Sequence, residues 1–488
     1  MKYTLLFLFS VMFSWAWGQS EMSAFTATGR GGVATTFVDD YQAIGINPSN
    51  LGWSPKFSGK HVAFSFLEGG TSIYTDALTK KDLWASMLGF GNEKFTHEQK
   101  LQAASEFASK DLAFNVDMSL FSLSVKTEKA GGFAFGVRDR MQWYSKLNQT
   151  AAELMFLGRR APYFDSFVLT NGDTLTNLSS ITVDSLDAAG AIENGLNLVP
   201  SPFSEVLNGT KMTFNWFREF NFSYGIEVYS NENVSLYVGA GVKYLQGLAL
   251  IDINSNDTEF NAISALSPVF NIDYGQAAQQ HPSFTTQDGW FPKGVGSGMG
   301  FDAGISAIFN ESIRVGLAVN DIGALNWKTN VFKATDAPLR DLGSAGFDNY
   351  NIIAEAQKIY GADGIMEWDG EVARKVKLPT VARAGISYWA SDKFEVGADF
   401  VLPLNDVSGN YESLLWGLGV DFKPAPWVTL ATGFSGGGNY DFNIPFGVTF
   451  NVGNGAWEFG VASRDMVTFF AQNRPTLSLS MGFLRFRI

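Results

Sequence analysis

The chain has 488 residues, a formal net charge of −13 and no cysteine. An acidic chain has no general attraction for phosphate backbones, which argues against nucleic acid as a partner. The missing cysteines exclude disulfides and thiolate metal sites. Aromatic residues make up 15% of the chain, 51 residues are glycine and only 17% are charged, a balance that resembles a sheet protein in contact with lipid.

The first 18 residues have the pattern of a signal peptide. Lys2 supplies a positive start, an apolar run extends from Leu5 to Trp17, and Ala16-Trp17-Gly18 places small residues where a signal peptidase cleaves. The run is shorter than the roughly 20 apolar residues that a spanning helix needs. We therefore expect residues 1–18 to be removed and the remainder to be exported, either as a soluble protein or as a closed barrel in an outer membrane.

Strict alternation of apolar and polar residues separates these two possibilities. From Phe220 to Val228 every second residue is apolar, and the pattern resumes from Val234 to Tyr244. Such runs predict strands with one apolar and one polar face. They extend over about 9–12 residues, which is the length that crosses a bilayer at a tilt and exceeds the usual strand of a soluble sandwich.

Fourteen strands are predicted, and the connections between them alternate in length. The strands lie at roughly 60–67, 112–127, 130–141, 214–229, 234–249, 299–309, 313–320, 380–390, 393–403, 413–423, 426–434, 444–452, 455–463 and 476–487. Outer-membrane barrels join their strands by short turns on the inner side and longer loops outside. The predicted fold is therefore all-β: a transmembrane antiparallel β-barrel of about 14 strands over residues 60–488, located in the outer membrane.

Features outside the simple alternation give further expectations. The apolar phase changes near Phe483, which predicts a β-bulge in the last strand.

Thr96 begins a helix-like run through Ala108 with Glu98 near its third position, and a second such run covers Lys80 to Leu88. Leu101, Ala104 and Phe107 share a face of the first run and are expected to pack on the barrel mouth or to receive a partner. The tryptophans expected at the lipid–water interface are Trp216, Trp389, Trp416, Trp427 and Trp457.

Charged residues on the polar parity are predicted to face the lumen, since a charge on the lipid face costs about 2–4 kcal/mol near the midplane. One interpretation is a polar pathway or a ligand lining, and the other is a network of ion pairs that fills the interior and holds the N-terminal segment. The predicted lumen residues are Arg138, Arg140, Glu219, Glu227, Lys243, Asp302, Arg383, Glu395, Asp399, Asp421 and Glu458.

Short motifs resemble those of known outer-membrane barrels. The Gly-rich start at 29–32, the pair Asp39-Asp40 and the box Asn47-Pro48-Ser49 resemble long-chain fatty-acid transporters of the FadL type and the PorV-like barrels of type IX secretion in Bacteroidota. Three further motifs are similar to PorV-like and related uncharacterised Bacteroidota barrels: the stretch from Val319 to Trp327, Lys377-Leu378-Pro379 and the Leu-Arg-Phe-Arg end. Ser49 replaces the alanine that is usual in the box.

The resemblance implies a fourteen-stranded barrel whose N-terminal segment, residues 19–59, folds into the lumen as a hatch. Asn47, Pro48 and Ser49 would lie in that hatch, although Asn-Pro also favours a plain turn before the first strand. FadL-type members pass hydrophobic molecules through a gap in the barrel wall, whereas PorV-like members accompany a translocon.

Residues for catalysis or metal binding are not indicated. His61, His97 and His281 have no metal-ligand spacing, and the Gly-rich start lacks the flanking elements of a phosphate loop. We therefore expect neither an enzyme nor a cofactor. The first functional hypothesis is transport of hydrophobic small molecules, with membrane lipid and a hydrophobic ligand as partners. The alternative is a non-transporting partner of type IX secretion or surface proteins.

Overall fold

The computed structural model describes residues 23–54, 60–79, 94–176, 178–256, 259–350, 355, 366–407, 409–411, 413–438, 440–471 and 476–488. The predicted signal peptide, residues 1–18, and the helix-like run at 80–88 lie outside these described residues. No helix in the described part of the chain is both long and apolar enough to cross a bilayer.

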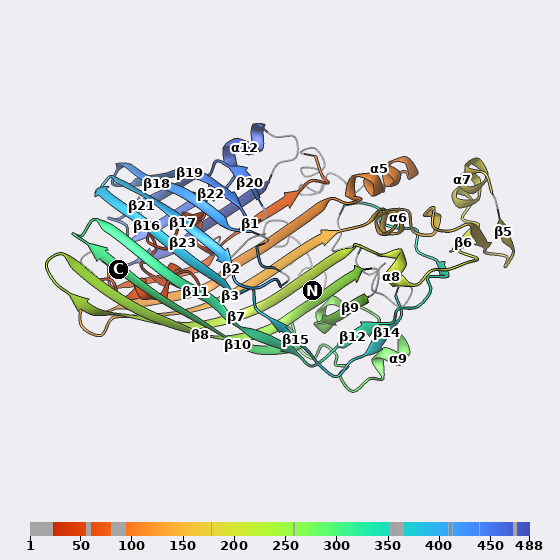
Figure 1. Cartoon of the computed structure of the whole chain (residues 1–488), viewed down its shortest axis with the longest axis horizontal. Coiled ribbons are helices and arrows are strands. Elements are labelled where there is room, and N and C mark those ends of the chain that lie inside the picture. The colour runs from red at the N-terminus through yellow and green to blue at the C-terminus, as the bar shows by residue number, and fades with distance from the viewer. Residues whose placement is uncertain are drawn as a thin grey trace.

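A closed antiparallel barrel of fourteen strands dominates the described residues (Figure 1). Each strand pairs with the next, and the last pairs with the first, for example at Phe64 and Phe486, so the sheet has no open edge. The barrel strands are β1 (Val62–Thr75), β2 (Asp111–Lys126), β3 (Gly132–Lys146), β7 (Lys211–Ser230), β8 (Val234–Asn256), β10 (Gly296–Phe309), β11 (Ile313–Trp327), β16 (Val381–Ser391), β17 (Phe394–Pro403), β18 (Leu415–Ala425), β19 (Val428–Gly437), β21 (Phe446–Val452), β22 (Trp457–Ser463) and β23 (Leu477–Arg487).

The two ends of the barrel differ, as the alternating connections predicted. At one end the strands are joined by short turns such as 231–233, 310–312 and 392–393, and we call this the turn end. The opposite end, which we call the loop end, carries every long connection. Several strands continue past their predicted limits at the loop end: β8 ends at Asn256 and β11 at Trp327.

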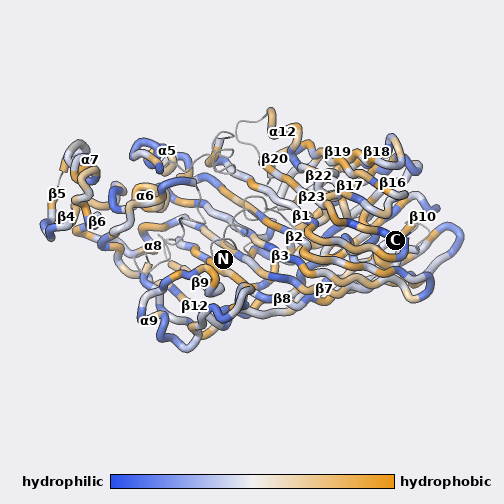
Figure 2. The backbone as a smooth tube through the Cα atoms, turned by 180° about the vertical axis from the view of Figure 1, so that it is seen from behind, coloured by the Kyte–Doolittle hydropathy of each residue, from blue (hydrophilic) through white to orange (hydrophobic). Residues whose placement is uncertain are grey.

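The barrel wall is apolar outside and small or polar inside. Along β10, Met299, Phe301 and Ile305 are about half exposed, while the alternating Asp302 and Ser306 are buried. Figure 2 shows hydrophobic stretches along the barrel strands. Because a closed barrel satisfies every backbone hydrogen bond within its own ladder, an apolar exterior of this kind suits a bilayer.

The long connections fold into additional structure at the loop end. Short strands extend the wall there, and a separate four-stranded sheet with the order β13-β6-β4-β5 projects beyond the barrel together with α7 (Figure 1). The strands are β4 (Ser166–Leu169), β5 (Thr174–Thr176), β6 (Ile192–Leu196), β9 (Glu259–Leu266), β12 (Val331–Ala334), β13 (Asp341–Leu342), β14 (Trp368–Gly370), β15 (Arg374–Lys377) and β20 (Tyr440–Asn443). The helices are α5 (His97–Phe107), α6 (Gln149–Leu157), η4 (Gly158–Arg160), α7 (Ser180–Ala188), α8 (Phe203–Val206), η5 (Pro268–Phe270), α9 (Gly275–Gln279) and α12 (Met466–Ala471).

These loop-end elements share a large hydrophobic core, which corrects one sequence prediction. Trp216 was expected at the lipid interface, but it is only 4% exposed and packs in this core with Phe214 and Phe270. Trp427 and Trp457 are exposed on the outer surface near the turn end, as expected for interface residues. The alternation on β7 is the same whether its apolar side faces lipid or packs against the loop-end core. Parity alone therefore could not tell a lipid-facing tryptophan from a buried one.

The predicted helix after Thr96 is confirmed with changes in detail. The Thr96 side chain accepts a hydrogen bond from the backbone N–H of Gln99, whose side chain accepts from the backbone of Thr96 in return, so the capping box uses Gln99 rather than Glu98. Ala104 and Phe107 are buried as predicted. Leu101 is 45% exposed, because the buried face of the helix turns slightly away from it.

The predicted bulge near Phe483 is also confirmed. The pairing of β22 with β23 shifts between Glu458 and Gly460, so that Phe483 and Leu484 together oppose Phe459. Both bulged side chains are exposed, and the phase change turns Arg485 into the barrel.

Candidate functional site: the barrel interior

The N-terminal segment, residues 23–54, lies inside the barrel and is buried almost throughout. It contains the short helices α2 (Phe25–Thr28), η2 (Tyr41–Ala43) and η3 (Pro48–Gly52). Glycines on the inner wall allow it to approach the strands closely. A Cβ on Gly239 would lie 2.4 Å from the backbone of Pro48, and a Cβ on Gly304 would lie 2.1 Å from the side chain of Asn47. Part of the high glycine content therefore serves this contact.

The Asn47-Pro48-Ser49 box is fully buried against β8, β10 and β11. Asn47 caps η3, where its Oδ1 accepts hydrogen bonds from the backbone N–H and the hydroxyl of Ser49. The Ser49 hydroxyl lies 2.9 Å from Ser306 Oγ, and the indole of Trp53 donates to the same oxygen over 2.9 Å. The box thus forms a turn, as the plain interpretation expected, and this turn is bonded to the barrel wall.

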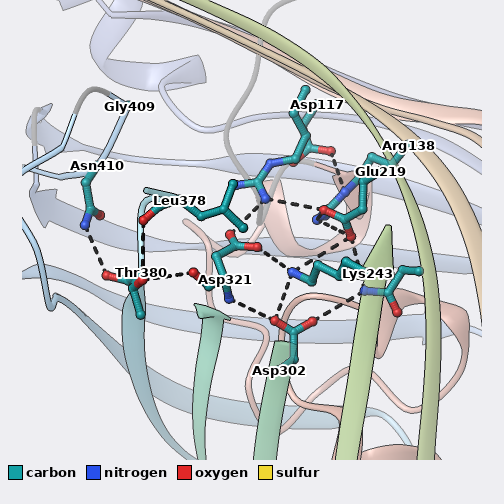
Figure 3. A network of polar contacts seen from close by, with 12 residues as sticks. Asp117, Arg138, Glu219, Lys243, Asp302, Asp321, Leu378, Thr380, Gly409 and Asn410 are labelled. Carbon is teal, nitrogen blue, oxygen red and sulfur yellow. Dashed lines mark hydrogen bonds and ion pairs between the residues drawn. The ribbon is translucent and has the colours of Figure 1, made fainter. Parts of the chain in front are cut away.

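A network of seven buried charges crosses the lumen in the middle of the barrel (Figure 3). Lys243 on β8 lies 2.9 Å from Asp302 on β10 and also bonds Asp321 on β11. Its side chain is fully buried, so each of these contacts is made away from bulk water. The complete set consists of three cations, Arg138, Arg140 and Lys243, and four carboxylates, Asp117, Glu219, Asp302 and Asp321.

The two arginines share Glu219 as a partner, and Arg140 also connects it to Asp321. Arg138 Nη2 lies 3.1 Å from Glu219, and Arg140 Nη1 lies 2.8 Å from Asp321 and 3.5 Å from Glu219. The network therefore links β2, β3, β7, β8, β10 and β11. Since breaking one buried ion pair leaves its partner charge unpaired, the members hold each other in place.

Asp321 reaches the lumen only because β11 contains a bulge. Phe301 pairs with Ile322 and Ala303 with Val319, so Asn320 and Asp321 together oppose Asp302. Asp321 adopts a left-handed conformation, with φ of 61°, and its N–H donates to Asp302 Oδ1 over 2.9 Å. A left-handed residue that is not glycine is uncommon, and aspartate is among those that tolerate it best.

A second group of charges binds the N-terminal segment to the other side of the barrel. Asp40 lies 2.7 Å from Arg485, and Asp39 lies 3.2 Å from both Lys126 and Arg487. Glu458, one of the predicted lumen residues, lies 3.2 Å from Arg485 and 3.4 Å from Arg487. In the same region the hydroxyl of Tyr41 donates to Glu68 over 2.5 Å, and Gln42 donates to the same carboxylate.

The remaining predicted lumen residues contact the N-terminal segment, lie buried on the inner wall or, in one case, are exposed. Asp421 lies 2.8 Å from Arg30, and Asp399 accepts the backbone N–H groups of Ala34 and Thr35, each over 2.8 Å. Glu395 lies 2.9 Å from Arg314, and Arg383 is buried on the inner face of β16. Glu227 differs from the expectation, because it is exposed at the turn end, where β7 leaves the barrel.

Several interior residues were not predicted. Asp321 is part of a bulge, and Glu68 follows Leu67, a left-handed residue at which the burial parity of β1 reverses without a shift in register. The adjacent apolar residues Phe66-Leu67 were the signal for the second of these. Arg30, Asp39 and Asp40 belong to the N-terminal segment, which has no strand parity to read. Their partners are up to 448 positions away, as for Asp39 and Arg487.

The polarity of the inner wall changes abruptly on the loop-end side of the network. The next inward residue of β8 after Lys243 is Leu245, which packs in a buried apolar cluster with residues of β7, β9 and β11. The cluster consists of Phe217, Leu245, Leu250, Ile263, Ala265, Val295, Leu325, Trp327, Val331 and Leu378. The interior therefore consists of an apolar zone toward the loop end, then the ion network, then the N-terminal segment.

The wall beside this apolar zone contains an interrupted seam. The ladder of β11 with β16 ends at Asn320 and Val381, and that with β15 begins at Ala324 and Lys377. Between them Pro379 has no N–H to donate. One backbone hydrogen bond, from Leu378 N–H to Gly323, spans the gap together with one from the side chain of Thr380 to the carbonyl of Asp321 over 2.9 Å.

The loop after β17 supports that seam from one side. Asn405 donates to the carbonyl of Leu378 over 2.9 Å, and Asn410 donates to the carbonyl of Thr380 over 3.1 Å. Figure 3 shows Leu378, Thr380 and Asn410 beside the ion network. The same short stretch of wall is thus bonded to the lumen charges through Asp321 and to a surface loop.

Pockets are present at the turn end of the described structure. One of about 190 Å³ lies between the N-terminal segment and the wall, next to Asp39, Trp53 and Arg314. A wider groove of about 1090 Å³ runs along the turns and includes His61 and Glu227. Among the described residues, no group of three or more His, Asp or Glu side chains is arranged to hold a metal ion.

Solved structures with a similar fold cover nearly the whole chain at low identity. The toluene transporter TbuX of Ralstonia pickettii is 12% identical, with 96% of this chain and 99% of that chain covered and a TM-score of 0.44. The toluene transporter TodX of Pseudomonas putida is 10% identical, with 95% and 97% covered and a TM-score of 0.41. A FadL homologue of Pseudomonas aeruginosa is 11% identical, with 96% and 97% covered and a TM-score of 0.41.

Comparison of the sequence with family models and curated proteins gives one match. None of the curated proteins matches the chain. One family model, described as a family of unknown function (DUF5723), matches residues 187–463, from the end of α7 to the end of β22. Because this match covers more than half of the 488 residues, the protein belongs to the DUF5723 family of unknown function.

Proposed function

We propose that the protein is an outer-membrane barrel of the FadL/PorV type that carries hydrophobic small molecules, which enter at the loop end and leave sideways through the barrel wall. The orientation follows from the connections, since short turns face the periplasm and long loops the outside in such barrels. The proposed role is passage without chemical conversion. The signal peptide at 1–18 and the hatch role of residues 19–59 are parts of the same proposal.

The observation that carries the proposal is the position of the interrupted seam against the apolar zone. Leu378 belongs both to the seam and to the buried apolar cluster. A hydrophobic molecule that replaces side chains of this cluster loses little solvation, whereas the charged network below it presents a desolvated ionic layer. The easiest exit from the apolar zone is therefore through the wall toward lipid and not along the barrel axis.

A disulfide across the seam tests this route in a chain that has no cysteine of its own. Val319 and Ala382 are paired on neighbouring strands β11 and β16, and they lie next to the interruption. Directly opposed residues have Cβ atoms about 4.5–5.5 Å apart, which a disulfide can join with little movement. We expect the double cysteine variant, when oxidised, to lose uptake of radiolabelled oleate and toluene in a host without its own transporter, and to regain uptake after reduction.

The matched control places the same cross-link away from the seam. Ala398 and Leu418 are paired on β17 and β18, where the ladder is continuous. This control pair is expected to transport both probes in either redox state. Transport that persists in the oxidised Val319–Ala382 variant would contradict a lateral exit at this seam, and absence of uptake by the unmodified protein would contradict the transport function.

A second candidate function is favoured by the folded module at the loop end. The sheet of β4, β5, β6 and β13 and helix α7 form their own small core around Phe167, Val183 and Ile192. A channel needs only loops there, whereas a partner protein can bind such a rigid projection. The resemblance to PorV-like barrels points to a secretion or surface protein as that partner. Removal of residues 166–196, joined by a short linker, should then abolish co-purification with the partner but leave uptake of the probes unchanged.

A further inference from the structure

The register of four neighbouring strands marks where the apolar outer surface ends. Outward residues fall into rows across β8, β10, β11 and β15, and these rows change in character toward the loop end. The first row is apolar: Val242, Phe301 and Ile322. The second contains Tyr244, Met299, Ala324 and Lys377, and the third is polar throughout: Gln246, Ser297, Asn326 and Lys375.

The width of the apolar surface agrees with that of a bilayer. From Phe309 at the turn end to Met299, β10 rises by ten residue steps, or about 33 Å at about 3.3 Å per residue. At the usual tilt this corresponds to an apolar band about 25 Å tall. Lys377 therefore lies at the upper boundary of the lipid layer, with Lys375 one row above it.

Three lysines at this boundary have no counter-ion in the part of the chain that the structure describes. Lys328, Lys375 and Lys377, which we call the lysine rim, are exposed, and none is within ion-pair distance of a carboxylate among the described residues. In the loop before β10, by contrast, Lys293 lies 2.8 Å from Asp288.

The loop before β10 exposes two aromatic side chains. Gly294, at the end of this loop, lies against the side chain of Gln246 and therefore at the level of the polar row. In that loop Trp290 is 75% exposed and Phe291 is 80% exposed. Aromatic residues at this depth are typical of the interface between lipid and water.

We propose that the lysine rim binds the phosphate groups of lipid headgroups in the leaflet at the loop end, while Trp290 and Phe291 enter the interfacial layer beside them. The rim lies directly above apolar wall, so a bound phosphate whose acyl chains run down that wall satisfies both surfaces together. Lys375 and Lys377 are two residues apart on one strand, or about 7 Å, which lets them bind one phosphate or two adjacent ones. This site is independent of any transport through the barrel.

The test compares lipid binding by the full chain purified in detergent, measured by native mass spectrometry. The probes are lipid A with its phosphates and lipid A from which they have been removed. We expect the protein to prefer the phosphorylated form, and Lys375→Gln with Lys377→Gln to weaken its binding by about 10- to 30-fold, since the contribution of each lysine near an anionic membrane surface corresponds to about a fivefold change in binding. Lys328→Gln, which lies outside the strand ladder, is a second variant with a smaller loss.

The matched control removes the same charge at the other end of the barrel. Lys129→Gln with Lys423→Gln changes two exposed lysines at the turn end and should leave the preference intact. Equal binding of the two lipid A forms, or an equal loss in the control, would overturn the proposal. Displacement of the lipid by millimolar inorganic phosphate alone would also overturn it, because the rim would then be a general anion site. Heat-dependent gel mobility verifies that each variant is folded.

Discussion

Replacement of Lys243 by methionine is the sharpest perturbation of the interior. Methionine has a similar length but no charge, so the shape of the network changes little. The substitution removes the cation that lies 2.9 Å from Asp302 and 3.9 Å from Glu219 and that also bonds Asp321. Four carboxylates then remain with two arginines, all of them buried.

The expected cost follows from the burial of these groups. Removal of one partner of a buried ion pair costs about 3–5 kcal/mol, because the remaining charge keeps its desolvation penalty without compensation. That corresponds to a change of about 10²- to 10³-fold or more in the unfolding equilibrium. Neutralising one acid at the same time, as in Lys243→Met with Asp302→Asn, should recover part of the loss, since the two sites are in contact.

Urea unfolding of the barrel in lipid vesicles, followed by tryptophan fluorescence and heat-dependent gel mobility, measures this loss. Lys423→Met at the exposed turn end is the control and should change the free energy of unfolding by no more than about 0.5 kcal/mol. A loss below about 1 kcal/mol for Lys243→Met would refute the reasoning, because it would mean that water reaches the network and solvates its acids.

Three further outcomes are expected. Gly239→Ala should displace the N-terminal segment and cost about 1–3 kcal/mol, with faster proteolysis of that segment, whereas Gly289→Ala, which has open space around it, should do neither. Thr96→Ala removes the cap of α5 and should speed amide exchange in that helix, at a cost of about 1 kcal/mol. Burial raises the pKa of Asp465 to about 7, above its unfolded value of 3.8, so its contribution to stability should fall between about pH 4 and pH 7. Asp465→Asn should remove this dependence in urea unfolding at pH 5 and pH 8, and an unchanged dependence would contradict it.

The barrel itself was predictable because membrane physics leaves few alternatives. A charge facing lipid is costly along every strand, so parity survives over the whole wall, and the inward placement of Glu219 and Lys243 followed from it. The regular alternation of short and long connections gave the order of the strands and the two ends of the barrel.

The rest was not predictable, for three physical reasons. Left-handed residues at Leu67 and Asp321, the second within a bulge, shift the parity by one residue, and such a local backbone choice is not contained in the periodicity. Contacts between remote segments, such as Arg30 with Asp421, have no local pattern at all. Trp216 shows a third limit, since an apolar side chain fits lipid and a protein core equally well.

The counter-ions of the N-terminal segment have a consequence for the order in which the molecule folds. Arg30 is neutralised on β18, Asp40 on β23 next to the C-terminus, and Asp399 of β17 is capped by amides of the segment. A wall that joined its first and last strands around an empty interior would enclose Asp399, Asp421 and Arg485 without these partners. The cylinder therefore gains its full stability only when the earliest part of the chain is already inside. A barrel that closes without its N-terminal segment is less stable than one that closes around it.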